Sequence, residues 1–226
     1  MKDIYAALSG ANSAWANLQS IANNLANAET RGYRESRVTF QLEGGKGLAA
    51  SYAAPGEMGY NRDDGELKTD GVSTHLALRG DGFFALADGT YTRDGAFRLD
   101  EEGQLCTEDG MPVEGDGGAI QLQPGEGVSV GVDGSVTGSK SGEIGRIKIA
   151  QLTNALPIGG ARWKGTAGEP EAGAVSVVQG ALEGSNVDAM RGMVEMIEAS
   201  RFFEAQQKAI QTSDEMRQRI NKIGGS

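Results

Sequence analysis

The chain is poor in the residue types on which most chemical sites depend. Its 226 residues include one cysteine, Cys106, and one histidine, His75. This excludes an intramolecular disulfide and any zinc site built from cysteine and histidine alone. No apolar run approaches the roughly 18 residues of a membrane span, and the N-terminus lacks the apolar stretch of a secretory signal. We therefore expect no metal, no cofactor, no membrane-spanning segment and no cleaved signal peptide.

Patterns of the common catalytic sites are missing as well. The sequence has no G-x-S-x-G elbow, no P-loop and no complete EF-hand loop, and His75 lies in an apparent strand. We therefore expect no catalytic residue. One alternative stays open, because the acid-rich middle of the chain could hold paired carboxylates of the glycosidase type. A secreted carbohydrate-active enzyme is thus the less favoured hypothesis.

Charge is distributed unevenly along the chain. There are 21 basic and 31 acidic residues, a net charge of −10. Residues 1–34 carry a net charge of +1 and residues 186–226 a net charge of 0, so the stretch between them holds −11. An acidic middle argues against a nucleic-acid partner, which needs a basic face. The near-neutral ends can pack side by side without strong repulsion.

Both ends show the apolar spacing of long helices. Residues 1–30 predict a helix with Gly32 as its stop, since apolar residues recur at alternating spacings of three and four. Residues 187–223 predict a second helix of about 55 Å, capped by Ser185 with Asp188, or by Asn186. The apolar positions are Ile4, Leu8, Ala11, Trp15, Leu18, Ala22 and Leu25 at one end, and Val187, Met190, Val194, Ile197, Phe203, Ile210 and then Met216 or Ile220 at the other.

The middle of the chain has the pattern of short strands joined by tight turns. Asp-Gly pairs recur from residue 81 to residue 134 between alternating apolar and polar runs, which is typical of hairpins. Strands are predicted at 83–86, 91–92, 96–99, 128–130 and 144–152.

These elements predict an α+β fold, in which long N- and C-terminal α-helices pack as a coiled-coil-like pair and an antiparallel β domain is inserted between them. The expected domains are a helical core of 1–34 and 181–226, an extended arm of 35–71 and a β-rich outer domain of 72–180. A 55 Å helix outreaches a domain of about 100 residues, whose radius of gyration is about 13 Å. The excess length needs the other terminal helix or other copies of the chain, although an adaptor that binds one helical partner is an alternative.

Motifs along nearly the whole chain resemble those of one family, the flagellar axial proteins of rod and hook. The N-terminal signature is matched by residues 21–27 (IANNLAN) and 30–33 (TRGY). The C-terminal signature is matched by 182–188 (LEGSNVD), 201–204 (RFFE) and 212–216 (TSDEM). The β domain of basal-body rod proteins is resembled by 78–84 (LRGDGFF), 91–97 (YTRDGAF) and 110–115 (GMPVEG).

The resemblance implies a structural subunit of the bacterial flagellar basal-body rod. The terminal helices would form the inner tube, and the subunit would reach the periplasm by type III export. Implied partners are further copies, the proximal and distal rod proteins, and the neighbouring basal-body rings. Only 47 residues separate Tyr33 from Asp81, fewer than in distal rod proteins. This favours the proximal rod and leaves the distal rod as the alternative.

The expected assembly interface consists of seam and signature residues at both ends. Asn23, Asn24 and Asn27 are expected to hydrogen-bond across helix contacts and fix their register. Arg201 is expected to pair with Glu204 or Glu198, with a solvated charged face as an equal alternative. The ends are expected to stay disordered until a neighbour covers them. The full set is Leu8, Trp15, Leu18, Ile21, Asn23, Asn24, Leu25, Asn27, Tyr33, Asn186, Val187, Val194, Ile197, Arg201, Phe203, Glu204, Ile210 and Met216.

Overall fold

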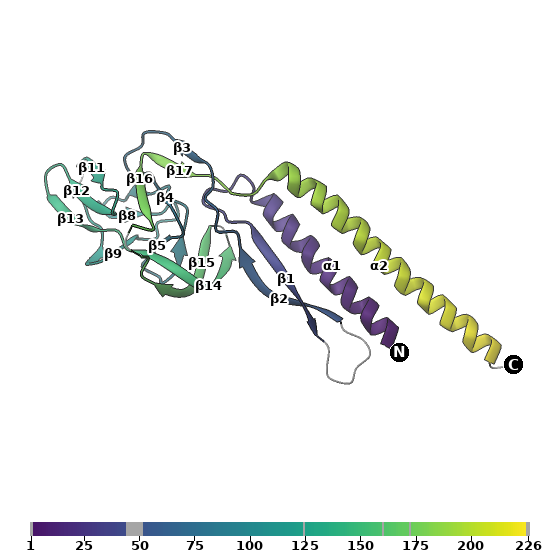
Figure 1. Cartoon of the computed structure of the whole chain (residues 1–226). Coiled ribbons are helices and arrows are strands. Elements are labelled where there is room, and N and C mark those ends of the chain that lie inside the picture. The colour runs from purple at the N-terminus through teal and green to yellow at the C-terminus, as the bar shows by residue number, and fades with distance from the viewer. Residues whose placement is uncertain (1, 44–51, 124, 160, 172, 225–226) are drawn as a thin grey trace. The chain divides into compact units, whose positions relative to one another are not determined.

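The computed structural model describes residues 2–43, 52–123, 125–159, 161–171 and 173–224. Within these ranges the chain forms two helices and seventeen strands (Figure 1). The expected fold class, a coiled-coil-like helix pair with one inserted β domain, is wrong. The protein is β-rich, and its strands lie in many small sheets rather than in one inserted domain. Frequent glycine turns account for this, because they limit most strands to a few residues.

The chain divides into two compact units. The helical unit comprises Met1–Ala26, Ser36–Gly59 and Asp188–Ser226, and the β unit comprises Asn27–Glu35 and Tyr60–Val187. The helical unit contains α1 (Lys2–Ala26), α2 (Ala189–Gly224) and a two-stranded sheet of β1 (Ser36–Glu43) and β2 (Tyr52–Tyr60). The segment expected to be an extended arm therefore contains strands, two of which belong with the helices.

Helices α1 and α2 pack side by side and antiparallel (Figure 1). The rings of Trp15 and Phe203 have centroids 5.5 Å apart. On one side of this contact, a Cβ atom added at Gly10 would lie 3.5 Å from Gln206. On the other side, a Cβ atom at Gly192 would lie 4.0 Å from Leu25. At each of these two glycines, a side chain of the other helix comes close to the helix backbone.

The helix ends differ from the sequence expectation. Helix α2 starts after Asp188, whose carboxylate accepts a hydrogen bond from the Arg191 backbone N–H at 3.1 Å. Asp188 is therefore the N-cap, in place of Ser185 or Asn186. Helix α1 ends at Ala26, before Gly32. Gly32 belongs to the β unit and has a φ of 64°, and a Cβ atom added there would overlap the backbone of Arg93.

The β unit is built from short antiparallel pairs and a closed four-stranded barrel of β14, β15, β6 and β5. The expected strands at 83–86, 91–92 and 128–130 are confirmed, that at 96–99 is shorter, and that at 144–152 is divided between β13 and β14. The strands are β3 (Leu67–Thr69), β4 (Leu76–Arg79), β5 (Phe83–Ala85), β6 (Tyr91–Thr92), β7 (Arg98–Leu99), β8 (Leu105–Cys106), β9 (Glu114–Gly115), β10 (Gly118–Ala119), β11 (Val128–Val130), β12 (Ser135–Gly138), β13 (Gly142–Arg146), β14 (Ile149–Gly159), β15 (Arg162–Gly168), β16 (Ser176–Gln179) and β17 (Ala181–Glu183).

Two apolar clusters hold the β unit together. The larger is centred on Leu76, Phe84 and Phe97, with the two phenylalanine rings edge to face at 5.0 Å. The smaller consists of Phe83, Leu152, Ala155 and Trp163, all of which lie on strands of the barrel. Because the β unit has its own buried cores, the two helices are not needed as its cover.

Candidate assembly interface

One side of α1 is exposed and carries no charge. The sequence has no charged residue between Asp3 and Glu29. Leu8 and Trp15 are each 48 % exposed. Along the same line of the helix the exposed residues are spaced four and three apart, as Leu8, Asn12, Trp15, Gln19, Ala22 and Ala26. We call these six residues the α1 face.

Helix α2 has two apolar faces on opposite sides. One contains the Phe203 ring that contacts Trp15, and its residues are partly or fully buried: Gly192, Met196, Ala199, Phe203, Gln206 and Ile210. The other holds four large apolar residues that are between 53 % and 79 % exposed: Met190, Met193, Val194 and Ile197. We call these four residues the α2 patch.

The predicted α2 seam combines residues of both faces. Val194 and Ile197 lie in the exposed α2 patch, whereas Phe203 and Ile210 lie on the face toward α1. Beyond the patch its side of the helix becomes polar, with Arg201 and Glu204 exposed. Of the remaining expected seam residues, the partly buried ones are Leu18, Ile21, Leu25 and Val187, and Met216 is exposed. The side chains of Ile4 and Ile220 lie outside the described residues.

The expected asparagines make contacts within the chain. Asn24 is buried and pairs with the Ser36 backbone, donating from Nδ2 to the carbonyl and accepting from the N–H, both at 2.8 Å. It thereby fastens the first residue of β1 to α1 inside the helical unit. In the β unit, Asn27 accepts a hydrogen bond from the Thr30 hydroxyl at 3.1 Å. Asn23 is exposed on α1.

Tyr33 and Asn186 lie where the chain enters and leaves the β unit. Tyr33 is buried, and its carbonyl accepts a hydrogen bond from the Asn186 N–H at 3.2 Å. The Asn186 side chain accepts from the Glu35 N–H at 2.7 Å and donates to the Asp63 carbonyl at 2.8 Å. Asn186 therefore joins the entering and leaving segments to each other.

A buried charge cluster lies beside this junction. It consists of Arg34, Asp64, Arg93 and Glu183, and we call it the junction cluster. The side chains of Arg34, Arg93 and Glu183 are at most 2 % exposed. Glu183 pairs with Arg93 Nε and with Arg34 Nη2, the latter at 3.0 Å, and Asp64 pairs with both arginines. Burial lowers the pKa of Arg93, and Glu183 and Asp64 oppose that shift.

Sequence reasoning missed the junction cluster. Its residues are separated by up to about 150 positions, and isolated charges in a sequence are normally exposed. Arg93 directly precedes one of the Asp-Gly pairs. That pair predicted a turn, but it did not indicate that the arginine side chain is buried. No spacing pattern in the sequence brings these four residues together.

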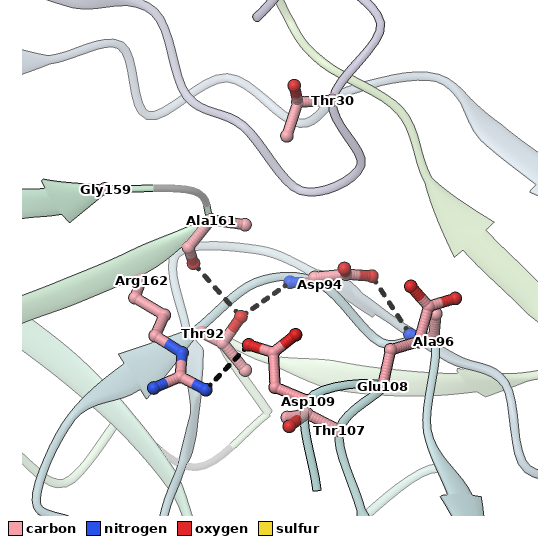
Figure 2. A pocket seen from close by; sticks show the side chains of 10 residues that line it. All are labelled: Thr30, Thr92, Asp94, Ala96, Thr107, Glu108, Asp109, Gly159, Ala161 and Arg162. Carbon is pink, nitrogen blue, oxygen red and sulfur yellow. Dashed lines mark hydrogen bonds and ion pairs between the residues drawn. The ribbon is translucent and has the colours of Figure 1, made fainter. Parts of the chain in front are cut away.

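A pocket of about 470 Å³ in the β unit is lined by three acids, Asp94, Glu108 and Asp109. Figure 2 shows Arg162 reaching Asp109, and these groups pair at 2.9 Å. Arg31 pairs with Glu108 at 2.7 Å and with Asp94 at 3.5 Å. Burial raises the pKa of Asp94, and the charges of Glu108 and Asp109 add to the shift. Each of the three carboxylates is thus already bound by an arginine.

Comparisons with known proteins agree with the sequence motifs. Residues 178–223 match the family described as flagellar basal body rod FlgEFG protein C-terminal. Residues 77–138 match the flagellar hook protein FlgE/F/G D1 domain. The flagellar basal-body rod protein FlgG of Bacillus subtilis is 33 % identical, with 97 % of this chain and 98 % of the relative covered. This chain belongs to the flagellar basal-body rod proteins.

Other members of the family align equally fully. FlgF of Rhizobium meliloti is 33 % identical over 99 % of this chain and 98 % of its own length. FlgF of Escherichia coli is 32 % identical over 97 % of both chains. In the described ranges neither helix combines the length and apolarity that crossing a bilayer requires. Membership of the family identifies the chain as a structural component of the flagellar basal body.

Proposed function

We propose that the chain is a non-enzymatic rod subunit that polymerises through α1 and α2, together with copies of itself and with other rod proteins. The observation that carries this proposal is the α2 patch. Four large apolar side chains that are all more than half exposed and adjoin one another on two turns of one helix have the character of an interaction surface. The uncharged α1 face supports the same conclusion from the other helix.

We place the subunit in the periplasmic, proximal part of the rod. The short stretch between the N-terminal signature and the β unit supports this position, because only 47 residues separate Tyr33 from Asp81. Export without a cleaved signal peptide and contacts with the basal-body rings belong to the same proposal.

The pocket chemistry favours a structural role over hydrolysis. A glycosidase needs one carboxyl as acid and a second as base or nucleophile across the same bond. Here Asp94 and Glu108 share Arg31, and Asp109 holds Arg162, so their charges are already compensated within the protein. We therefore expect that the purified protein releases no fragments from peptidoglycan. Fragment release that is lost in Asp94→Asn would favour the enzyme instead.

The test of the rod function is a charge placed in the α2 patch. Val194→Asp puts a carboxylate at a position that is 57 % exposed in the single chain. The monomer is therefore expected to keep its fold, while burial of the charge between subunits blocks assembly. Gln211→Asp, at an exposed polar position of the same helix, is the matched control. Cells carrying Val194→Asp should be non-motile and should lack rods in isolated basal bodies. Normal motility in that strain would contradict the proposal.

A deletion strain tests the proximal position. If the subunit lies below the distal rod, basal bodies without it should also lack the distal rod protein, because later subunits need the earlier ones as their template. Basal bodies that retain distal rod protein would place this chain elsewhere in the rod.

A further inference from the structure

The α1 face is uncharged and largely apolar although it is exposed in the single chain. An exposed helix side normally carries charged residues. The α1 face instead contains Leu8, Trp15 and two alanines, with one asparagine and one glutamine as its polar members. Its residues recur at alternating intervals of four and three, which is the spacing of the residues that contact a second helix packed along the first.

Other sides of α1 already contact α2 and β1 of the same chain. Gly10 is approached by Gln206 of α2, and Asn24 is bonded to Ser36 of β1. Trp15 touches the Phe203 ring and is still 48 % exposed, so it stands at the border between the contact with α2 and the α1 face. A second helix can therefore reach the α1 face without displacing α2.

The α2 patch is complementary in size and character. Met190, Met193, Val194 and Ile197 are all bulky and apolar, whereas Leu8 and Trp15 are separated by the smaller Asn12. Bulky side chains of one helix fit into the gaps that smaller residues leave on another. Because α2 meets α1 of its own chain through the opposite side, the α2 patch cannot be covered by that α1.

We propose, on the basis of the rod function above, that the α1 face of one copy packs against the α2 patch of a second copy. The contact is heterologous, since it joins different surfaces of the two copies. Contacts of that kind repeat without limit unless they close into a ring, and so they build a helical filament. A single polar residue within an apolar helix contact fixes its register, and Asn12 has that place here.

The positions of the two surfaces set the stagger between copies. Within one chain, Gly10 lies opposite Gln206 and Trp15 opposite Phe203, so Leu8 is level with a residue near Lys208. Copies along a filament point the same way, so α1 of one copy again runs antiparallel to α2 of the next. Centring Leu8 and Trp15 on the α2 patch then places Leu8 opposite Ile197 and Trp15 opposite Met190. This is a shift of about 12 residues, or about 18 Å along the helix axis.

Disulfide trapping in native basal bodies tests this register. Cells express two full-length forms of the chain, one with Leu8→Cys and one with Ile197→Cys, and are oxidised before basal bodies are isolated. Each form carries a single new cysteine, and Cys106 is buried, so a covalent dimer reports a contact between copies. The control replaces Ile197→Cys by Lys208→Cys, which an unstaggered neighbour would bring to Leu8. Lys208 is exposed on the same side of α2.

We expect roughly tenfold more dimer with Ile197→Cys than with Lys208→Cys, because a disulfide requires Cα atoms within about 7 Å and the two positions are about 16 Å apart. A second pair, Trp15→Cys with Met190→Cys, should give the same result and covers a failure of the first pair to incorporate. More dimer with Lys208→Cys, or incorporation of both forms without dimer, would overturn the stagger. If the wild-type chain is absent from basal bodies, the rod function itself fails.

Discussion

Replacing Glu183 by glutamine tests whether the junction cluster holds the β unit together. The substitution keeps the size of the side chain and removes its charge. Its carboxylate faces Arg93 Nε, accepts from Arg34 Nη2 at 3.0 Å and accepts from the Gly65 N–H at 2.9 Å. In Glu183→Gln two buried guanidinium groups share Asp64 as their one remaining carboxylate partner in the cluster.

The expected cost follows from burial. Removing one partner from a buried ionic cluster costs about 3–5 kcal/mol, because two guanidinium charges then stay buried against a single carboxylate. Asp64→Asn is the matched control, since the Asp64 side chain is 37 % exposed and Glu183 remains. Water can replace a partly exposed carboxylate, so this control should cost about 1 kcal/mol.

The two tryptophans allow the measurement to be made on the β unit alone. Trp15 belongs to the helical unit and Trp163 to the β unit, where it is 1 % exposed. In a Trp15→Phe background, urea unfolding at pH 7 can be followed by Trp163 fluorescence. A Glu183→Gln variant within about 1 kcal/mol of its parent, or an equal loss in Asp64→Asn, would refute the role given to the cluster.

Three further substitutions probe other parts of the chain. The pKa of Glu126 is lowered to about 2 by backbone hydrogen bonds, so it stabilises the fold above its ordinary value of 4.5 and ceases to do so as the pH falls toward 2. Glu126→Gln should therefore melt below wild type at pH 6, with a smaller gap at pH 3, and a gap that does not depend on pH would contradict this. Asn24→Ala removes two hydrogen bonds to Ser36, which should destabilise the start of β1 by about 1–3 kcal/mol and speed amide exchange at Ser36. Gly95→Ala would drive a Cβ atom into the Leu76 carbonyl oxygen, so loss of folded protein in a thermal melt is expected.

The existence of both helices was predictable, but the use of their faces was not. Apolar spacing located α1 and α2 within a few residues. The same spacing fits either face of α2, because Met190 and Val194 on one side and Met196 and Phe203 on the other both follow it. Periodicity reveals that a stripe is apolar, whereas the identity of the element that covers it depends on tertiary contacts.

The strands after α1 were not among those predicted from the sequence. The sequence of β1, SRVTFQLE, alternates apolar residues at Val38, Phe40 and Leu42, which is a strand signal that the glycines and charges following it obscured. The Asp-Gly turns were a better guide in the middle of the chain. Gly89, Gly110 and Gly134 have the positive φ that such turns require. The junction cluster could not be predicted from such patterns, because its residues come together only in the folded β unit.

The paired entry and exit of the β unit have a consequence for how such a chain can be changed. Gly32 N–H donates to the Glu183 carbonyl and Asn186 N–H donates to the Tyr33 carbonyl, so the two crossing segments are fastened like the base of a hairpin. Between them the chain passes through β1 and β2 of the helical unit, continues through the β unit from Tyr60 onward, and returns to the segment from which it started. Residues can be added to or removed from the loops between these two hydrogen bonds without altering the distance between the segments that the bonds join. This pair of hydrogen bonds marks the point at which a foreign module can be grafted onto the subunit.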